Sequence, residues 1–150
     1  MDDFDRTILR ELQENARISL NDLSAKVGLS PTPVGRRLRQ LEQNGPIEGY
    51  TVLLNEAALG YGMSVFVSVQ LDRQVDEALA IFEAAVQSFP EVVDCWLMTG
   101  NRDYLLRVVT TDLSAFERFL VGQLTKVEGV SSIESSIPLR RVKAGLTRGA

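Results

Sequence analysis

The spacing of apolar residues in the first part of the chain, residues 1–60, is that of α-helices. Apolar side chains recur there at intervals of three and four residues, which places them on one helix face. The pattern predicts a helix at about residues 3–14, a second that Ser19 caps and Gly28 ends, and a third that starts at Ser30. Two helices alone cannot bury a core, so the first helix is expected to supply a third wall.

From residue 61 onward the apolar period changes. Every second residue from Met63 to Leu71 is apolar, and the positions between them carry Ser64, Phe66, Ser68 and Gln70, which is typical of a strand with one buried face. The remaining elements are predicted, in order, as a helix at 75–88, strands at 92–99 and 104–111, a helix capped by Asp112, and a strand at 130–142. This β-α-β-β-α-β order is that of the ferredoxin-like fold. The two helices are therefore expected to cover one face of a single sheet.

The second and third predicted helices, with a glycine turn between them, have the arrangement of a helix-turn-helix motif. Prolines in the first turn of the third helix are tolerated, because N–H groups there have no partner within the helix. No acidic residue interrupts the stretch from Ser30 to Leu41. Its basic residues, expected on faces away from the core, are Arg36, Arg37 and Arg39. Such a helix suits the major groove of DNA, although the same pattern suits a solvated amphipathic helix.

Each candidate DNA contact in this motif has a chemical reason. The first turn of the third helix exposes backbone N–H groups, which favour phosphate. The residues of that turn proposed to meet DNA are Ser30, Thr32 and Pro33. Arg36 and Arg37 are predicted to reach guanine edges or phosphates, and Arg39 to contact a phosphate.

A strand is predicted directly after the third helix, at residues 47–54, where a wing or a swapped connecting ribbon would lie. Residues 55–62 then form a hinge-like segment that ends in two glycines. The predicted domains are therefore residues 1–60, a winged helix-turn-helix with its connecting strand, and residues 61–150, a ferredoxin-like domain. The fold class is α+β.

The sheet face that the helices leave uncovered is expected to be apolar. It should carry Phe66 together with either Trp96 and Met98 or Cys95 and Leu97. Because such a face should not remain in water, we expect it to pack against another subunit. A dimer would also pair two recognition helices, as the reading of palindromic DNA requires.

Composition narrows the classes of function. The formal net charge is −4, so any binding to nucleic acid must use a local basic patch. The chain has no histidine and a single cysteine, Cys95, which excludes a disulfide framework or a Cys/His zinc site within one chain. Catalysis by histidine is excluded as well, so an enzyme is not expected. Cys95 lies in an apolar run, which predicts a buried structural thiol.

The hydropathy of the chain indicates no membrane segment. No apolar run approaches the length of a membrane span, and the acidic N-terminus is unlike a signal peptide. A cytoplasmic protein is therefore expected.

Several segments taken together resemble the Lrp/AsnC, or feast/famine, family of transcriptional regulators. They are Asp5–Leu9, Asn15–Ser19, Leu23–Val34 and Thr99–Tyr104. The resemblance covers nearly the whole chain and implies a winged helix-turn-helix domain joined to a regulatory (RAM) domain. It also implies dimers that assemble into octamers, DNA that is wrapped or bent, and amino-acid effectors that bind between dimers.

The resemblance also implies where an effector would bind. Family members place the pocket at the turn before the third strand of the second domain and on the last strand. The candidate effector residues are Gly100, Asn101, Asp103, Tyr104, Ile133 and Ser135. The turn can supply backbone N–H and C=O groups, and Asp103 a carboxylate, to a free amino acid. Relatives often carry threonine at the position of Ile133, so its apolar side chain argues against a polar effector. An ordinary hairpin turn would select Gly100 and Asp103 as well.

The sequence therefore predicts a sequence-specific, DNA-binding transcriptional regulator of amino-acid metabolism that a small amino acid modulates. The alternative is an architectural DNA-binding protein of the same fold that takes no effector. The expected partners are double-stranded DNA, a second copy of the chain within an octamer of four dimers, and the amino acid. No other cofactor, no metal and no membrane is expected.

Overall fold

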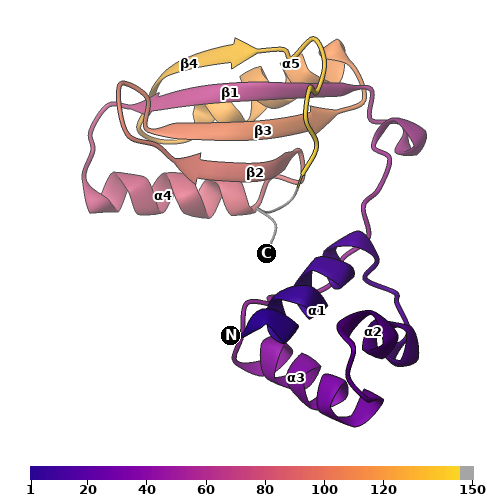
Figure 1. Ribbon diagram of the computed structural model, residues 1–150. Helices are drawn as coiled ribbons and strands as arrows, with labels where there is room; N and C mark the ends of the chain where they lie inside the picture. Colours follow the sequence, from indigo (N-terminus) through magenta and orange to yellow (C-terminus); the bar gives the residue numbers. More distant parts are fainter. Residues whose placement is uncertain (146–150) are drawn as a thin grey trace. The chain divides into compact units, whose positions relative to one another are not determined.

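The computed structural model describes residues 1–145 and forms two compact units, whose main segments are Met1–Leu53 and Leu54–Val142 (Figure 1). Helices build the first unit, and a sheet with two covering helices builds the second. No helix in the described part of the chain is long and apolar enough to cross a bilayer.

Three helices make up the first unit: α1 (Asp3–Glu14), α2 (Leu20–Val27) and α3 (Pro31–Gln43). All three were predicted from the apolar period, and α1 supplies the third wall as expected. The buried apolar residues of this unit are Ile8, Leu23, Val27, Val34 and Leu41. Every helix contributes to that cluster, so the orientation of α3 depends on both of its neighbours.

The ends of the helices follow local hydrogen bonding. Ser19 Oγ accepts a hydrogen bond from the Asp22 N–H at 3.1 Å, and Gly28 ends α2 with a φ of +77°, as predicted. Ser30 stands at the N-cap of α3, but its side chain makes no capping hydrogen bond, contrary to the prediction. A capping side chain accepts from the second or third helical N–H, and the third residue of α3, Pro33, has none.

The strand predicted at residues 47–54 is not formed, so the helix-turn-helix carries no wing strand in this chain. A strand requires a neighbour that satisfies its backbone N–H and C=O groups, and the described residues provide none beside this segment. Its apolar side chains are consequently exposed, with Val52 at 79% and Leu53 at 73%.

The second unit contains four strands and two longer helices in the predicted β-α-β-β-α-β order. The strands are β1 (Met63–Leu71), β2 (Val92–Leu97), β3 (Tyr104–Thr110) and β4 (Val130–Ser136). The helices are α4 (Asp76–Gln87) and α5 (Leu113–Gly122), with short 3-10 turns η1 (Ala57–Leu59) and η2 (Leu124–Lys126). Asp112 caps α5 as predicted, because its carboxylate accepts the Ala115 N–H at 2.7 Å.

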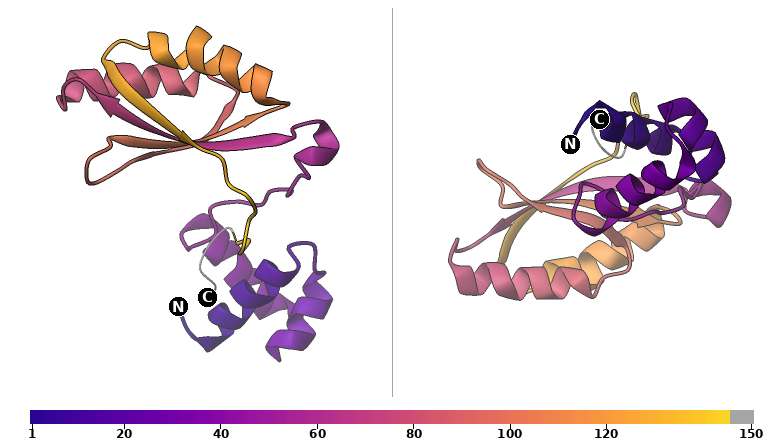
Figure 2. Two further views of the ribbon diagram at one scale, coloured as in Figure 1. Left: turned by 90° about the horizontal axis from the view of Figure 1, so that it is seen from above. Right: turned by 60° about the horizontal axis from the view of Figure 1, so that its bottom comes forward.

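The sheet has the antiparallel order β2-β3-β1-β4. Both helices cover the same face of it, as predicted (Figure 2, left). The strands direct alternate residues into this core, which explains the alternation in β1. The largest side chains buried there are Phe82, Tyr104 and Phe119.

The last strand, β4, ends at Ser136, six residues before its predicted end at residue 142. It pairs only with β1, and Ser136 lies opposite Phe66 at the end of that pairing. Pro138 follows shortly afterwards and has no N–H to donate to a ladder. An apolar pattern alone therefore overestimated the length of the strand.

The register decides which residues lie on the uncovered face of the sheet. Leu105 lies opposite both Ser68 and Trp96, so Trp96 shares the uncovered face with Phe66. Of the two alternatives predicted for the uncovered face, the one that contains Trp96 is therefore correct. Trp96 is 45% exposed in the single chain.

Cys95 lies opposite Leu106, on the side of the helices. It is nevertheless exposed, so its predicted burial is wrong. β2 is an edge strand, with a neighbouring strand on one side only, so its side chains are less completely covered than those of the inner strands. Partial desolvation and the nearby Glu83 carboxylate raise the pKa of the Cys95 thiol to about 11. The thiol therefore remains protonated at neutral pH and is a poor nucleophile.

Candidate nucleic-acid interface and ligand-binding turn

The start of α3 is open to solvent. Ser30, Pro31 and Thr32 are exposed, and Pro33 is half-buried. Backbone N–H groups at this helix terminus, together with the helix dipole, favour a phosphate. The predicted residues of the first turn therefore lie where a nucleic-acid backbone could reach them.

Arg36 and Arg39 share the exposed surface of α3. Within the described residues, neither side chain has an acidic partner, in contrast to Lys26, Arg37, Arg102 and Arg107. Two unpaired guanidinium groups on one short helix form a local basic patch in a protein of net negative charge. Guanidinium is the side-chain group best suited to guanine edges and phosphates.

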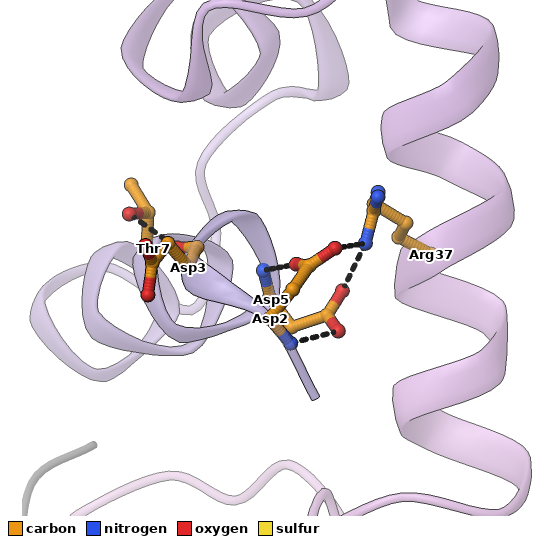
Figure 3. A network of polar contacts seen from close by, with 5 residues as sticks. All are labelled: Asp2, Asp3, Asp5, Thr7 and Arg37. Atoms are coloured by element: carbon orange, nitrogen blue, oxygen red, sulfur yellow. Dashed lines mark hydrogen bonds and ion pairs between the residues drawn. The ribbon is translucent and has the colours of Figure 1, made fainter.

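Arg37 does not lie with Arg36 and Arg39. Its Nη1 atom lies 2.8 Å from Asp5 Oδ1 and 2.8 Å from Asp2 Oδ2, at the start of α1 (Figure 3). Its Cζ atom also lies 5.4 Å from the centre of the Phe4 ring, within the range of a cation–π contact. Both carboxylates therefore contact the same nitrogen atom of the guanidinium group.

The periodicity of α3 explains this placement. Arg37 follows the buried Val34 by three positions and precedes the buried Leu41 by four, so it belongs to the face that packs on α1 and α2. That spacing was readable in the sequence. The basic character of Arg37 obscured it, because a charged residue between apolar ones is usually assigned to the solvent side.

The turn that precedes β3 is built around Asp103, which is 4% exposed. Its Oδ2 accepts the Leu71 N–H at 2.7 Å, and its Oδ1 accepts from Gln74 Nε2 at 2.5 Å. The Asp103 N–H donates to the Val69 carbonyl at 2.9 Å. Gly100 within the turn has a φ of +105°, which side chains other than glycine rarely adopt. Asp103 thus fixes the turn on the end of β1.

The other predicted effector residues lie in three different environments. Asn101 is exposed at the turn. Tyr104 is buried, and its hydroxyl donates a hydrogen bond to Glu83 Oε1 at 2.8 Å. The centre of its ring lies 4.5 Å from that of Phe82. Desolvation and the Glu83 carboxylate raise the pKa of Tyr104. Ile133 packs against the core opposite Val69, and Ser135 is exposed.

Arg102 connects the turn to β4, and the sequence analysis did not single it out. Its Nη1 donates to Ser132 Oγ at 2.5 Å and its Nη2 to Glu134 Oε2 at 2.8 Å. Ser132 and Glu134 alternate with Ile133 and Ser135, so Arg102 crosses β1 on the uncovered face. A signal was available, because a long cation in a turn next to a serine-rich strand is a candidate for bridging them.

A hollow at the start of α4 contains none of the predicted effector residues. The hollow at the start of α4, of about 250 Å³, is lined by Asp72, Arg73, Val75, Glu77, Ala78, Ile81, Glu128 and Gly129. The turn and β4 therefore offer a partial, open surface to a ligand.

An exposed, basic third helix on a helix-turn-helix unit, joined to a separate α+β unit, defines a class: DNA-binding regulators with a distinct second domain. Sequence models identify the family. The AsnC-type helix-turn-helix domain matches residues 1–42, and the Lrp/AsnC ligand binding domain matches residues 64–147. The chain belongs to the Lrp/AsnC family of transcriptional regulators, as its sequence segments predicted.

Named relatives span nearly the whole chain. The Bkd operon transcriptional regulator of Pseudomonas aeruginosa is 46% identical over 142 residues, which cover 95% of this chain and 93% of the relative. The leucine-responsive regulatory protein of Escherichia coli K12 is 41% identical over 143 residues, covering 95% and 87%. These relatives are transcriptional regulators and not enzymes.

Solved structures show the same architecture. A transcriptional regulator from Neisseria meningitidis, crystallised as a complex with L-Met, has a TM-score of 0.91 at 39% identity, covering 96% of this chain and 93% of that one. An AsnC family regulator from Agrobacterium tumefaciens also has a TM-score of 0.91, at 37% identity, covering 99% and 96%. The fold of both units is thus that of the family.

Proposed function

We propose that this protein binds double-stranded DNA through α3 and regulates genes of amino-acid metabolism in response to a small amino acid. The observation that carries the proposal is the exposed first turn of α3, followed by the unpaired Arg36 and Arg39. In this proposal, Ser30, Thr32 and Pro33 face the phosphate backbone. Binding to chromosomal DNA implies a cytoplasmic location.

The first test removes the two unpaired arginines. The double variant Arg36→Ala/Arg39→Ala is expected to bind operator DNA at least roughly tenfold more weakly, because each good base contact contributes about 1–3 kcal/mol. If both side chains contact phosphate instead, the slope of log K against log salt should fall by about 0.9 for each. Fluorescence anisotropy at several salt concentrations measures both quantities.

A matched control is Arg118→Ala, which removes an exposed arginine from α5 in the other unit. It should leave both quantities unchanged. If the double variant bound DNA like the parent protein, α3 would not be the DNA-binding element and the proposal would fail.

The effector part of the proposal concerns the turn at residues 99–103 and the strand β4. Gly100 and Asn101 are proposed to contact the backbone groups of the amino acid, while Asp103 and Tyr104 hold the turn in shape from beneath. Ile133 and Ser135 are proposed to line the site from β4. The apolar Ile133 favours an aliphatic side chain on the ligand. The L-Met bound by the Neisseria regulator and the leucine-responsive name of the Escherichia coli relative support that class.

Calorimetric titration tests this part. Leucine, isoleucine and methionine are expected to release or absorb measurable heat, whereas aspartate and lysine should not. Gly100→Ala should abolish the heat, because its φ of +105° strains any other residue and displaces the turn. Gly122→Ala serves as the matched control, since a Cβ there meets open space. No heat with any amino acid would instead favour the architectural DNA-binding alternative.

Assembly is the remaining part of the proposal. The uncovered sheet face with Phe66, Leu105 and Trp96 is proposed to pack on a second copy, which pairs the two reading helices. The exposed residues 47–54 could then pair with the same segment of that copy. Four such dimers would form the octamer, with the amino acid between dimers favouring the assembly that binds it better. Sedimentation velocity in the calorimetry buffer measures the assembly directly.

A further inference from the structure

The three arginines of α3 have different surroundings. Arg36 and Arg39 are exposed and have no acidic partner among the described residues. The Arg37 side chain is 24% exposed and lies between two carboxylates of α1, that of Asp5 at 16% and that of Asp2 at 51%. The three guanidinium groups of α3 are therefore chemically alike, but two are open to a ligand and one is held by carboxylates of the same chain.

The two carboxylates are themselves held in place by the start of α1. Asp2 Oδ1 accepts the Asp5 N–H and Asp5 Oδ2 accepts the Asp2 N–H, each at 3.0 Å, which makes a reciprocal capping box. Each side chain thus uses one oxygen for the cap and offers the other to Arg37 Nη1 (Figure 3). Hydrogen bonding from the Asp5 N–H, and then Arg37, lowers the pKa of Asp2. We call this group the Asp2–Arg37–Asp5 clamp.

The clamp provides something that the apolar core does not. Val34 and Leu41 bury the same side of α3, but hydrophobic burial is non-directional and tolerates rotation of a helix about its axis. Charge-assisted hydrogen bonds are short and directional. The clamp therefore defines the rotation of α3 relative to α1, and with it the direction in which Arg36 and Arg39 point.

Direct binding of Arg37 to DNA is the less favourable reading. A movement of the guanidinium group toward a phosphate that drew Nη1 away from the carboxylates would give up two ionic contacts for one. It would also leave Asp2 and Asp5 unpaired beside Asp3, a third carboxylate in the same turn. Three uncompensated carboxylates would repel the approaching duplex.

We propose that Arg37 is a positioning residue, which through the Asp2–Arg37–Asp5 clamp holds α3 in the orientation that presents Arg36 and Arg39 to DNA. This inference rests on the proposed function. Asp2 and Asp5, two acidic residues at the start of α1, thereby become determinants of DNA affinity without touching the duplex.

The salt dependence of DNA binding separates a positioning role from a contact role. Arg37→Gln is expected to lower the affinity roughly tenfold, within the usual range for coupling between two sites. It should leave the slope of log K against log salt unchanged, because no phosphate contact is lost. Arg36→Gln and Arg39→Gln are the matched variants. If the arginine that is replaced contacts a phosphate, its variant should lower the slope by about 0.9. A slope for Arg37→Gln lowered by about 0.9 would overturn the proposal.

A second variant keeps the arginine and removes its partners. Asp2→Asn/Asp5→Asn removes two negative charges, which by electrostatics alone should strengthen DNA binding. The positioning role predicts the opposite, a loss of roughly tenfold, and no further loss when Arg37→Gln is added. Asparagine is also a good N-cap, so α1 keeps its start. Asp3→Asn, a neighbouring acidic residue outside the clamp, is the control and should not weaken binding.

The outcomes distinguish the two proposals. If Asp2→Asn/Asp5→Asn strengthened binding, the clamp would not position α3, even while the arginine variants on the exposed face still lost affinity. If those arginine variants also bound normally, the proposed use of α3 would fail independently. Circular dichroism of each variant shows whether the three helices remain folded. If Arg37→Gln loses helical signal, the DNA affinity of Asp2→Asn/Asp5→Asn decides whether the clamp positions α3.

Discussion

Replacement of Ile8 by alanine is expected to remove much of the stability of the N-terminal unit and to weaken DNA binding, while the C-terminal unit keeps its stability. Ile8 is fully buried where the three helices meet. Truncation of a buried isoleucine costs about 2–5 kcal/mol. A segment of the length of Met1–Leu53, the main part of this unit, has a total stability of roughly 3–8 kcal/mol. The substitution therefore removes most of the stability of the unit that reads DNA.

Differential scanning calorimetry and DNA binding together test this expectation. In the variant, the transition of the N-terminal unit should shift to a markedly lower temperature, and that of the C-terminal unit should stay where it is. Leu20→Ala, at a residue 41% exposed on α2, is the control and should cost much less. A variant that kept full DNA affinity would show that the five-residue core is not what holds α3 in place.

Replacement of Phe82 by alanine is expected to have the largest effect on the C-terminal unit. Phe82 is fully buried on α4, and its ring lies 4.5 Å from the ring of Tyr104 on β3. Loss of a buried phenylalanine side chain costs about 3–5 kcal/mol. For a unit of this size, that loss lowers the midpoint of thermal unfolding by at least roughly 12 °C.

The consequences of the Phe82 substitution reach the turn proposed to hold the effector. Tyr104 follows Asp103 directly, so a cavity beneath Tyr104 should loosen the turn as well as the core. Thermal unfolding, monitored by circular dichroism, measures the stability of the unit. Calorimetric titration with methionine measures whether the turn still binds the proposed effector. Leu113→Ala, at a residue 63% exposed on α5, is the matched control. An unchanged midpoint would mean that the core closes around the missing ring.

The sequence predicts the helices and strands well where the apolar side of each element is buried against other elements of the same chain. The alternation of β1 and the three-four spacing of the N-terminal helices are examples. The prediction of a strand at residues 47–54 is wrong because the described part of the same chain provides no element that pairs with this segment. Its apolar and β-branched residues suit a strand, but a strand is a property of two segments, and no neighbour lies beside this one in the described residues. Cys95 fails similarly, because an apolar run does not reveal that its strand lies at a sheet edge.

The candidate DNA site was predicted only partly, because residue type and helix face conflicted at Arg37. A guanidinium group on the third helix of a helix-turn-helix indicates DNA, whereas the spacing from Val34 and Leu41 indicates the interior. The partners that resolve the conflict, Asp2 and Asp5, are more than thirty residues earlier in the chain. Local patterns do not contain such pairings. The same limit applies to Arg102, whose partners on β4 are thirty or more residues later.

The position of Trp96 has a spectroscopic consequence. It is the only tryptophan in the chain, and it lies nearly half exposed on the sheet face that the helices leave open. Its emission thus comes from one indole at one surface, without background from a second. An indole that passes from water into an apolar contact emits at shorter wavelength. The protein therefore carries an intrinsic optical reporter at the surface where a second subunit would dock, and subunit association can be followed without a label.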